Sequence, residues 1–60
     1  MSSGLSLGEK ARLKRLAQHL RQVDVASAAR VAVADVIDFE KDRPVPDRIL
    51  SRITEALGLD

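Results

Sequence analysis

The sequence predicts an all-α domain of four short helices, and three observations support this prediction. Apolar residues recur at helical spacing in several segments, a loop with two prolines precedes the last segment, and the one strand-like alternation has no partner strand. At 60 residues the chain holds one domain at most, close to the lower size limit for independent folding. A domain this small usually depends on a well-packed helical core or on a partner subunit.

The first helix is predicted over Leu7 to His19, after a Ser- and Gly-rich stretch of residues 1–6 that is expected to be flexible. Ser6 is expected to cap its start, with Glu9 three residues later as in a capping box. Apolar residues at i, i+3, i+4 and i+7 predict its buried stripe: Leu13, Leu16, Ala17 and Leu20. The other side is expected to be exposed and basic, with Lys10, Arg12, Lys14, Arg15 and His19.

Two short helices are predicted next, over Gln22 to Ala29 and over Ala34 to Lys41. The first has small residues at helical spacing on its inner side, which allow another helix to approach closely: Val25, Ala26 and Ala29. The second regains helical spacing with Val36, Phe39 and Glu40. Between them, the alternation of Val31 and Val33 also permits a strand over Arg30 to Asp35, although an isolated strand has nothing to pair with.

The segment from Asp42 to Pro46 is predicted to be a loop, because two prolines within three residues forbid a regular helix. Asp47 is the expected N-cap of a last helix over Arg48 to Leu57. Its buried stripe is expected to comprise Ile49, Leu50, Ile53 and Leu57. Gly58 is free to adopt the left-handed conformation that ends such a helix.

The composition argues against several classes of function. The chain has no cysteine and one histidine, so neither a disulfide nor a metal site is expected. It has no apolar run of membrane-spanning length and no signal-peptide core, so a cytoplasmic location is expected. We expect no cofactor and no enzymatic activity, because neither a nucleophile–base–acid set nor a Gly-rich phosphate loop is present. The clustered carboxylates are expected to form a solvated face: Asp35, Asp38, Glu40 and Asp42.

Charge is distributed unevenly along the chain, although the net charge is only +1. Residues 1–34 contain six basic and two acidic side chains, whereas residues 35–60 contain four basic and seven acidic ones. A chain with this asymmetry can present a basic face to a polyanion despite its small net charge. The alternative is that these charges only solvate the surface.

The stretch LRQVDVASAARVAVADVIDFEKDRPVP, which begins at Leu20, resembles the core of the lambda-repressor-like (Cro/repressor, XRE-type) helix-turn-helix family. The matching positions are Leu20, Gln22, Ala26, Val31, Val36, Phe39, Glu40, Lys41 and Pro46. The opening LGEK and the ending ITEALGL are also similar to that family, so the resemblance covers Leu7 to Leu59. It implies a four-helix, or four-to-five-helix, DNA-binding domain over residues 7–60 with a helix-turn-helix.

Two positions depart from the family pattern. Arg30 stands where the family commonly has Gly, because the residue that ends the second helix often needs a positive φ. Ala32 stands where the family commonly has Ser or Thr as the cap of the third helix. Since alanine has no side-chain acceptor, the start of the third helix is expected to be weaker by roughly 1 kcal/mol.

The resemblance also implies which residues would face DNA, because the third helix of this family enters the major groove through its N-terminal part. Carried over by position, the base-contacting residues are Val33, Ala34, Ile37 and Asp38, with Asp35 alongside. Val33 and Ala34 are suited to thymine methyl groups, and Asp38 to a cytosine amino group. The expected phosphate contacts are Arg21, Gln22, Arg30, Lys41 and Arg43.

The function expected from this resemblance is that of a sequence-specific DNA-binding transcriptional regulator of the XRE type, which could act as a repressor or an activator. It would bind a two-fold operator on double-stranded DNA as a homodimer and would be nucleoid-associated when bound. Its dimer interface is expected at the chain end, with Ile49, Arg52, Leu57 and Leu59. The alternative is a protein-interaction module on the same fold, of an antiactivator or antitoxin-like kind, whose apolar and acidic third helix binds another protein.

Overall fold

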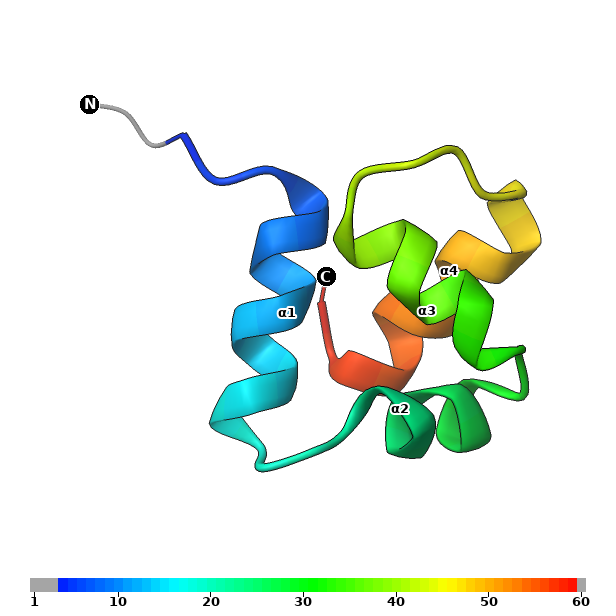
Figure 1. Ribbon diagram of the computed structural model, residues 1–60, viewed down its shortest axis with the longest axis horizontal. Helices are drawn as coiled ribbons and strands as arrows, with labels where there is room; N and C mark the ends of the chain where they lie inside the picture. The colour runs from blue at the N-terminus through cyan, green and yellow to red at the C-terminus, as the bar shows by residue number, and fades with distance from the viewer. Residues whose placement is uncertain (1–3, 60) are drawn as a thin grey trace.

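The computed structural model describes residues 4–59, and four α-helices lie within that range (Figure 1). They are α1 (Leu7–Ala17), α2 (Gln22–Ala29), α3 (Val33–Glu40) and α4 (Asp47–Leu57). Residues 4–59 form no strand, so the all-α prediction is confirmed and the strand alternative over Arg30 to Asp35 is wrong. Residues 1–3 of the N-terminal stretch that is predicted to be flexible lie outside the described residues.

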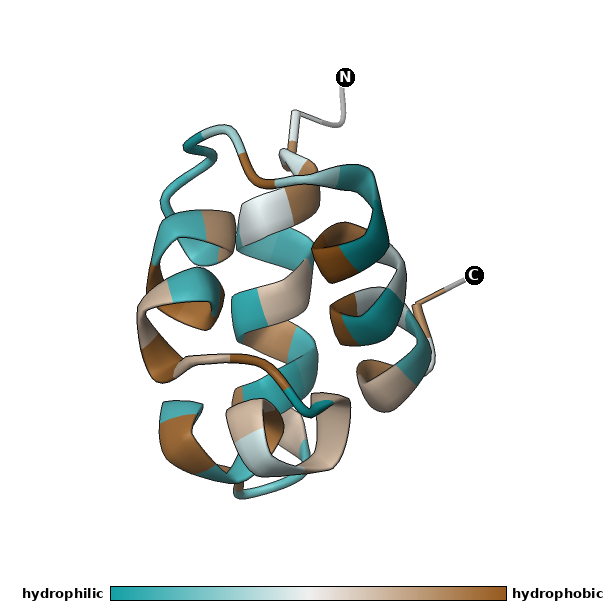
Figure 2. Ribbon diagram, turned by 90° about the vertical axis from the view of Figure 1, so that its right-hand side faces the viewer, coloured by the Kyte–Doolittle hydropathy of each residue, from teal (hydrophilic) through white to brown (hydrophobic). Residues whose placement is uncertain are grey.

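The helices enclose one core, to which α1 contributes one buried apolar side chain, α2 three, and α3 and α4 two each. α2 packs against α3 and α4, while α1 lies along one side of the molecule against α3 and α4 (Figure 1). The buried apolar residues are Ala11, Val25, Ala26, Ala29, Val36, Phe39, Ile53 and Leu57. Their burial confirms the inner faces that are predicted for α2, α3 and α4. Polar and apolar segments alternate along the helices, as amphipathic packing requires (Figure 2).

The buried face of α1 differs from the predicted one. Leu13 and Leu16, predicted to be buried, are 49% and 45% exposed, Ala17 is also exposed, and only Leu20 packs against the core. The face that is buried instead is formed by Gly8, Ala11 and Arg15. Gly8 and Ala11 are buried because α1 approaches the end of α3 too closely for leucines, and Arg15 is buried because it binds Glu40 of α3. Arg15, predicted to be exposed, is therefore a buried residue at 8% exposure.

A residue in the left-handed conformation follows each of the four helices, and only one of these residues is glycine. The φ angles are 59° at His19, 60° at Arg30, 60° at Asp42 and 75° at Gly58. In each case the following N–H group bonds to the carbonyl five residues earlier, as Val31 does to Ala26 at 3.0 Å. The conformation expected at Arg30 and Gly58 is confirmed. The first helix ends at Ala17, earlier than predicted, because the chain reverses its direction at His19.

The helix starts agree with the prediction for α1 and differ for α3 and α4. Ser6 and Glu9 form the expected capping box, with Glu9 N–H donating to Ser6 Oγ at 3.2 Å. α3 begins at Val33, one residue earlier than predicted, and its cap Ala32 offers no side-chain acceptor, as expected. The predicted N-cap Asp47 is wrong, because Pro46 is the cap and Asp47 is the first residue inside α4. There its charge favours the positive end of the helix dipole.

Candidate functional site

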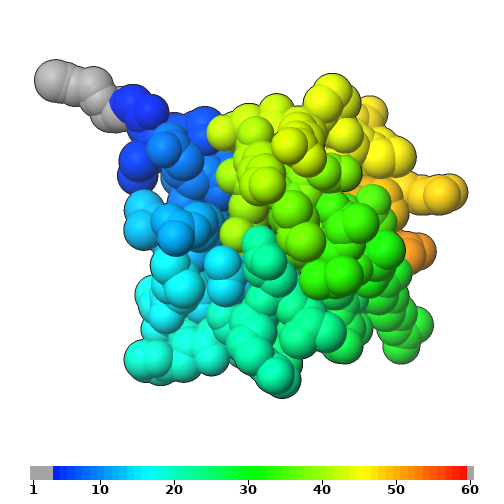
Figure 3. All heavy atoms as spheres, viewed as in Figure 1, coloured from blue at the N-terminus to red at the C-terminus, as the bar shows by residue number. Residues whose placement is uncertain are grey.

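The candidate site is the outer side of α3 together with the adjoining ends of α2. Three residues, Arg30 to Ala32, connect the two helices, and half-buried Val31 packs against the core from this connection. Val36 and Phe39 hold α3 to the core at 0% and 4% exposure. The opposite side of α3 is left uncovered and, with the loop that follows, lies on the face shown in Figure 3. Of the predicted base-contacting residues, Val33 and Ala34 are exposed, whereas Ile37 and Asp38 are half-buried.

This outer side of α3 is mostly apolar, and its two carboxylates are already engaged. Val33 is 42% exposed. Asp35 accepts a hydrogen bond from the Ala32 backbone N–H at 3.3 Å, which steadies the start of the helix. Asp38 forms a salt bridge with Arg43 at 3.3 Å. The surface therefore offers apolar contacts at its N-terminal end and one paired carboxylate farther along.

The predicted phosphate-binding cations lie at the ends of α2 and α3. Arg21 precedes α2, Arg30 ends it, Lys41 follows α3, and Arg43 reaches back to α3. Arg21 is paired with Asp24 at 3.1 Å, with a fully exposed guanidinium. The hydrogen bond from Arg21 holds the pKa of Asp24 below its ordinary value, so this carboxylate is charged at neutral pH. Within residues 4–59, Arg30 and Lys41 form no salt bridge.

The Gln22 side chain is engaged inside the protein, which corrects its predicted role as a free phosphate ligand. Its amide donates to Glu40 Oε1 at 3.2 Å. What remains at the start of α2 is the backbone, because the first N–H groups of a helix have no intrahelical partner. Gln22 can therefore offer its backbone N–H to an anion, while its side chain fixes α2 to the end of α3.

Glu40 belongs to a buried network that the sequence reasoning missed. Arg15 Nε and Nη2 donate to Glu40 Oε2 and Oε1 at 2.6 and 3.1 Å, and Arg15 Nη1 donates to the Leu20 carbonyl at 2.9 Å. The two side chains are 10% and 4% exposed. The network joins α1, the start of α2 and the end of α3, and so sets the position of the outer side of α3. The available signal was the i, i+3, i+7 spacing of Gly8, Ala11 and Arg15.

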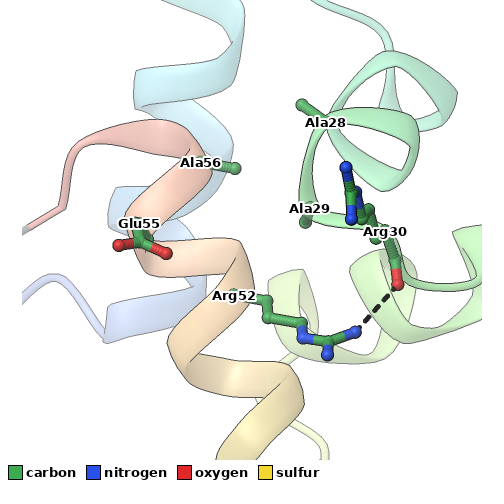
Figure 4. A pocket seen from close by; sticks show the side chains of 6 residues that line it. All are labelled: Ala28, Ala29, Arg30, Arg52, Glu55 and Ala56. Atoms are coloured by element: carbon green, nitrogen blue, oxygen red, sulfur yellow. Dashed lines mark hydrogen bonds between the residues drawn. The ribbon is translucent and has the colours of Figure 1, made fainter.

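A shallow hollow of about 340 Å³ lies between the end of α2 and α4 (Figure 4). Its lining residues are Ala28, Ala29, Arg30, Arg52, Glu55 and Ala56. Arg52 Nη1 donates to the Arg30 backbone carbonyl at 3.3 Å, as the dashed line in Figure 4 marks. The hollow thus has a floor of three alanines and a charged rim of two arginines and one glutamate.

The predicted dimer residues do not form one exposed surface. Arg52 is exposed, and Ile49 and Leu59 are half-buried. Leu57 is only 2% exposed, so its place in a dimer interface is wrong: it fills the core of its own chain. The chain end is held against α1, since the Gln18 amide donates to the Leu57 carbonyl at 3.2 Å.

Comparisons of the chain with protein-family models, with curated proteins and with solved structures gave no match. Within residues 4–59, no three His, Cys, Asp or Glu side chains come together in a way that could hold a metal ion. Over the same residues, no helix has the length and apolar character needed to cross a membrane.

Proposed function

We propose that this protein is a sequence-specific DNA-binding transcriptional regulator whose α2 and α3 form a helix-turn-helix. The observation that carries the proposal is the uncovered outer side of α3, which the core anchors Val36 and Phe39 hold in place. An uncovered helix side of this kind can face the major groove, which is about 12 Å wide. Val33 and Ala34, at the exposed N-terminal end of α3, are the first side chains that would meet base edges there.

Affinity in this proposal comes from the cations at the helix ends, because phosphate contacts supply most of the binding free energy. Arg21 and Arg43 are held next to α2 and α3 by Asp24 and Asp38. Both pairs are exposed, and exposed salt bridges contribute little stability, so a phosphate can compete for each guanidinium at small cost. The backbone N–H groups that open α2 add a further phosphate contact.

Removal of both paired arginines tests this function. We expect the variant with Arg21→Ala and Arg43→Ala to bind every duplex roughly 10- to 100-fold more weakly at low salt. The slope of log K against log salt should flatten by about 2, because two phosphate contacts are lost. The measurement is fluorescence anisotropy of a labelled duplex library over a salt series.

The matched control carries Arg12→Ala and Arg48→Ala, which removes the same charge from exposed positions on α1 and α4. Its salt slope should stay close to that of the wild type. Equal losses in both variants would mean that only net charge matters, and the phosphate assignment would then fail. Absence of any DNA binding by the wild type at low salt would refute the proposed function itself.

We further propose that the regulator acts as a homodimer through the exposed residues Arg52 and Glu55 on the α4 side of the hollow, with the half-buried Ile49 and Leu59 as additional expected contacts. Arg52 and Glu55 lie three residues apart on α4, and neither has a salt bridge within residues 4–59. Antiparallel packing of two α4 helices about a two-fold axis places each Arg52 opposite the other chain's Glu55. The alanine floor gives room for such an approach.

Charge reversal tests the dimer. We expect Arg52→Glu to weaken self-association by at least tenfold, because like charges then face each other across the axis. The double variant with Arg52→Glu and Glu55→Arg should restore it, since the attraction is rebuilt with reversed signs. Sedimentation equilibrium measures both dissociation constants. A double variant as weak as the single one would contradict this interface.

One observation favours a second function. The outer side of α3 is apolar and acidic, and two of its neighbouring arginines are neutralised by carboxylates. Such a surface also suits a protein partner, which would make the chain an antiactivator or antitoxin-like interaction module. Retention on heparin and a shift of promoter DNA from the protein's own locus support DNA binding. Failure of both at low salt, with the chain folded, supports the second function.

A further inference from the structure

Asp38 is the one side chain on the outer side of α3 that can discriminate bases by hydrogen bonding. Val33, Ala34 and Ile37 have no hydrogen-bonding groups, and Asp35 is engaged by the backbone N–H of Ala32. If α3 lies in a major groove, the apolar residues can sense thymine methyl groups but cannot distinguish donors from acceptors. If α3 distinguishes base pairs by hydrogen bonds, the Asp38 carboxylate must therefore form them.

Arg43 determines how that carboxylate is presented. Its Nη1 donates to Asp38 Oδ1 at 3.3 Å, and its backbone N–H donates to the Asp38 carbonyl at 2.8 Å. The backbone contact holds the loop beside α3, so the two side chains stay adjacent. Asp38 Oδ2 accepts no hydrogen bond from residues 4–59, and Arg43 keeps Nη2 and Nε free of such partners. The side chains are 39% and 59% exposed.

Asp38 and Arg43 thus offer a free acceptor, Asp38 Oδ2, next to free donors, Arg43 Nη2 and Nε. A C·G base pair displays the complementary order in the major groove: the cytosine amino donor, then the guanine O6 and N7 acceptors. An A·T pair fits less well, because its adenine amino donor has one acceptor on each side, thymine O4 and adenine N7, and so it lacks the two adjacent acceptors that guanine offers to an arginine. The positive charge of Arg43 also offsets the repulsion between Asp38 and nearby phosphates.

On the basis of the proposed DNA binding, we infer that Asp38 and Arg43 read a single C·G base pair in each half-site. Asp38 Oδ2 accepts from the cytosine N4 amino group, and Arg43 donates to guanine O6 or N7. Arg43 is then a specificity-determining residue as well as a cation. Val33 and Ala34 contribute shape and methyl contacts beside this base pair.

The test is selection of binding sites from a randomised duplex library by the wild type, Asp38→Asn and Asp38→Ala, each checked for helicity by circular dichroism. We expect the wild type to prefer C·G at one position per half-site by roughly 10- to 100-fold over the other base pairs. Asp38→Asn should change this preference to A·T, because an amide pairs with adenine N6 and N7. Asp38→Ala should abolish the preference at that position and leave the others intact.

Lys41→Ala is the matched control, since Lys41 is an exposed cation next to α3 whose side chain forms no salt bridge with Asp38. It should lower affinity for all sites alike and keep the C·G preference, whereas Arg43→Ala should reduce that preference. Site preferences that are the same in the wild type and in both Asp38 variants overturn the inference and leave DNA binding standing. A wild-type preference for A·T at the Asp38-dependent position also overturns it. Failure of the wild type to enrich any duplex refutes the proposed function as well.

Discussion

Replacement of Arg15 with methionine is expected to lower the free energy of unfolding by about 3–5 kcal/mol, because it leaves the Glu40 carboxylate buried without its charge partner. Arg15 supplies two hydrogen bonds to Glu40 and one to the Leu20 carbonyl. A single core in a domain of this size rarely supplies more than about 3–5 kcal/mol. The variant should therefore be largely unfolded at 25 °C. Urea denaturation followed by circular dichroism measures the loss.

Two further variants separate the buried ion pair from general effects of the substitution. Arg12→Met changes an exposed arginine on the same helix and should alter stability by no more than about 0.5 kcal/mol. Arg15→Met combined with Glu40→Leu removes both charges and should recover most of the stability, because an apolar pair avoids the desolvation cost. A loss below about 1 kcal/mol for Arg15→Met alone would contradict the buried pair.

Substitution of Gly8 with alanine is expected to destabilise the protein by about 2–3 kcal/mol, because an added methyl group overpacks the contact between α1 and α3. A Cβ atom there would meet the Phe39 carbonyl oxygen, with Asp42 Oδ1 at 2.7 Å and the Glu40 carbonyl oxygen at 2.8 Å. Two of these three atoms belong to the backbone, so no side-chain rotation can relieve the overlap. The Gly8 N–H also donates to Asp42 Oδ1 at 3.0 Å, and this bond would be strained.

The two possible environments of Gly8 predict changes of opposite sign in the stability of Gly8→Ala. Alanine in place of glycine inside an exposed helix stabilises it by about 1 kcal/mol. A gain in thermal unfolding temperature for Gly8→Ala would therefore show that α1 does not lie against the end of α3. Gly58→Ala serves as a comparison, because its surroundings are open and its cost comes from the φ of 75° instead. That cost should be about 1 kcal/mol.

Both variants bear on function through the position of α3. Arg15 and Gly8 lie on α1, yet both contact the C-terminal end of α3 or the residues that follow it. In the variants that stay folded, Gly8→Ala and the double variant of Arg15→Met with Glu40→Leu, the altered contact should let α3 shift while Val36 and Phe39 still bury their side chains. The outer side of α3, with Asp38, would then lose its fixed relation to the start of α2, so under the proposed function these variants should bind DNA less specifically while they keep their helical content.

Much of the fold follows from local sequence signals. α2 is predicted to the residue, because the spacing of Val25, Ala26 and Ala29 leaves one apolar side. Ser6 with Glu9 marks the start of α1, and the prolines at 44 and 46 mark the loop before α4. These features depend on neighbours within one or two helical turns, and such interactions are present in the order of the residues itself.

The sequence-based predictions are wrong for residues whose neighbours in the structure come from a distant part of the chain. Leu13 and Leu16 have helical spacing, and hydrophobicity alone predicts that they are buried, yet no other helix covers them. Leu57 was expected both in the buried stripe of the last helix and at a dimer surface, and its burial in the core of its own chain confirms only the first expectation. Gln22 was expected to face a phosphate, but Glu40, 18 residues away, accepts its amide hydrogen.

The sequence by itself determined the helical class and the inner faces of α2 to α4, because periodicity and capping are local properties. The exposure of Val33 and Ala34 was expected from the family resemblance. Only the tertiary structure decided that Arg15 is buried against Glu40 and that Gly8 is a contact point between α1 and α3. It also decided that Arg43 stands beside Asp38. Arg15 and Glu40 lie 25 positions apart in the sequence, and Gly8 lies 31 or more positions from the residues that it contacts. Asp38 and Arg43 lie five positions apart, on either side of the end of α3. Helix packing brings the first two pairs together, and the turn after α3 places Arg43 beside Asp38. No pattern of hydrophobic spacing encodes these contacts.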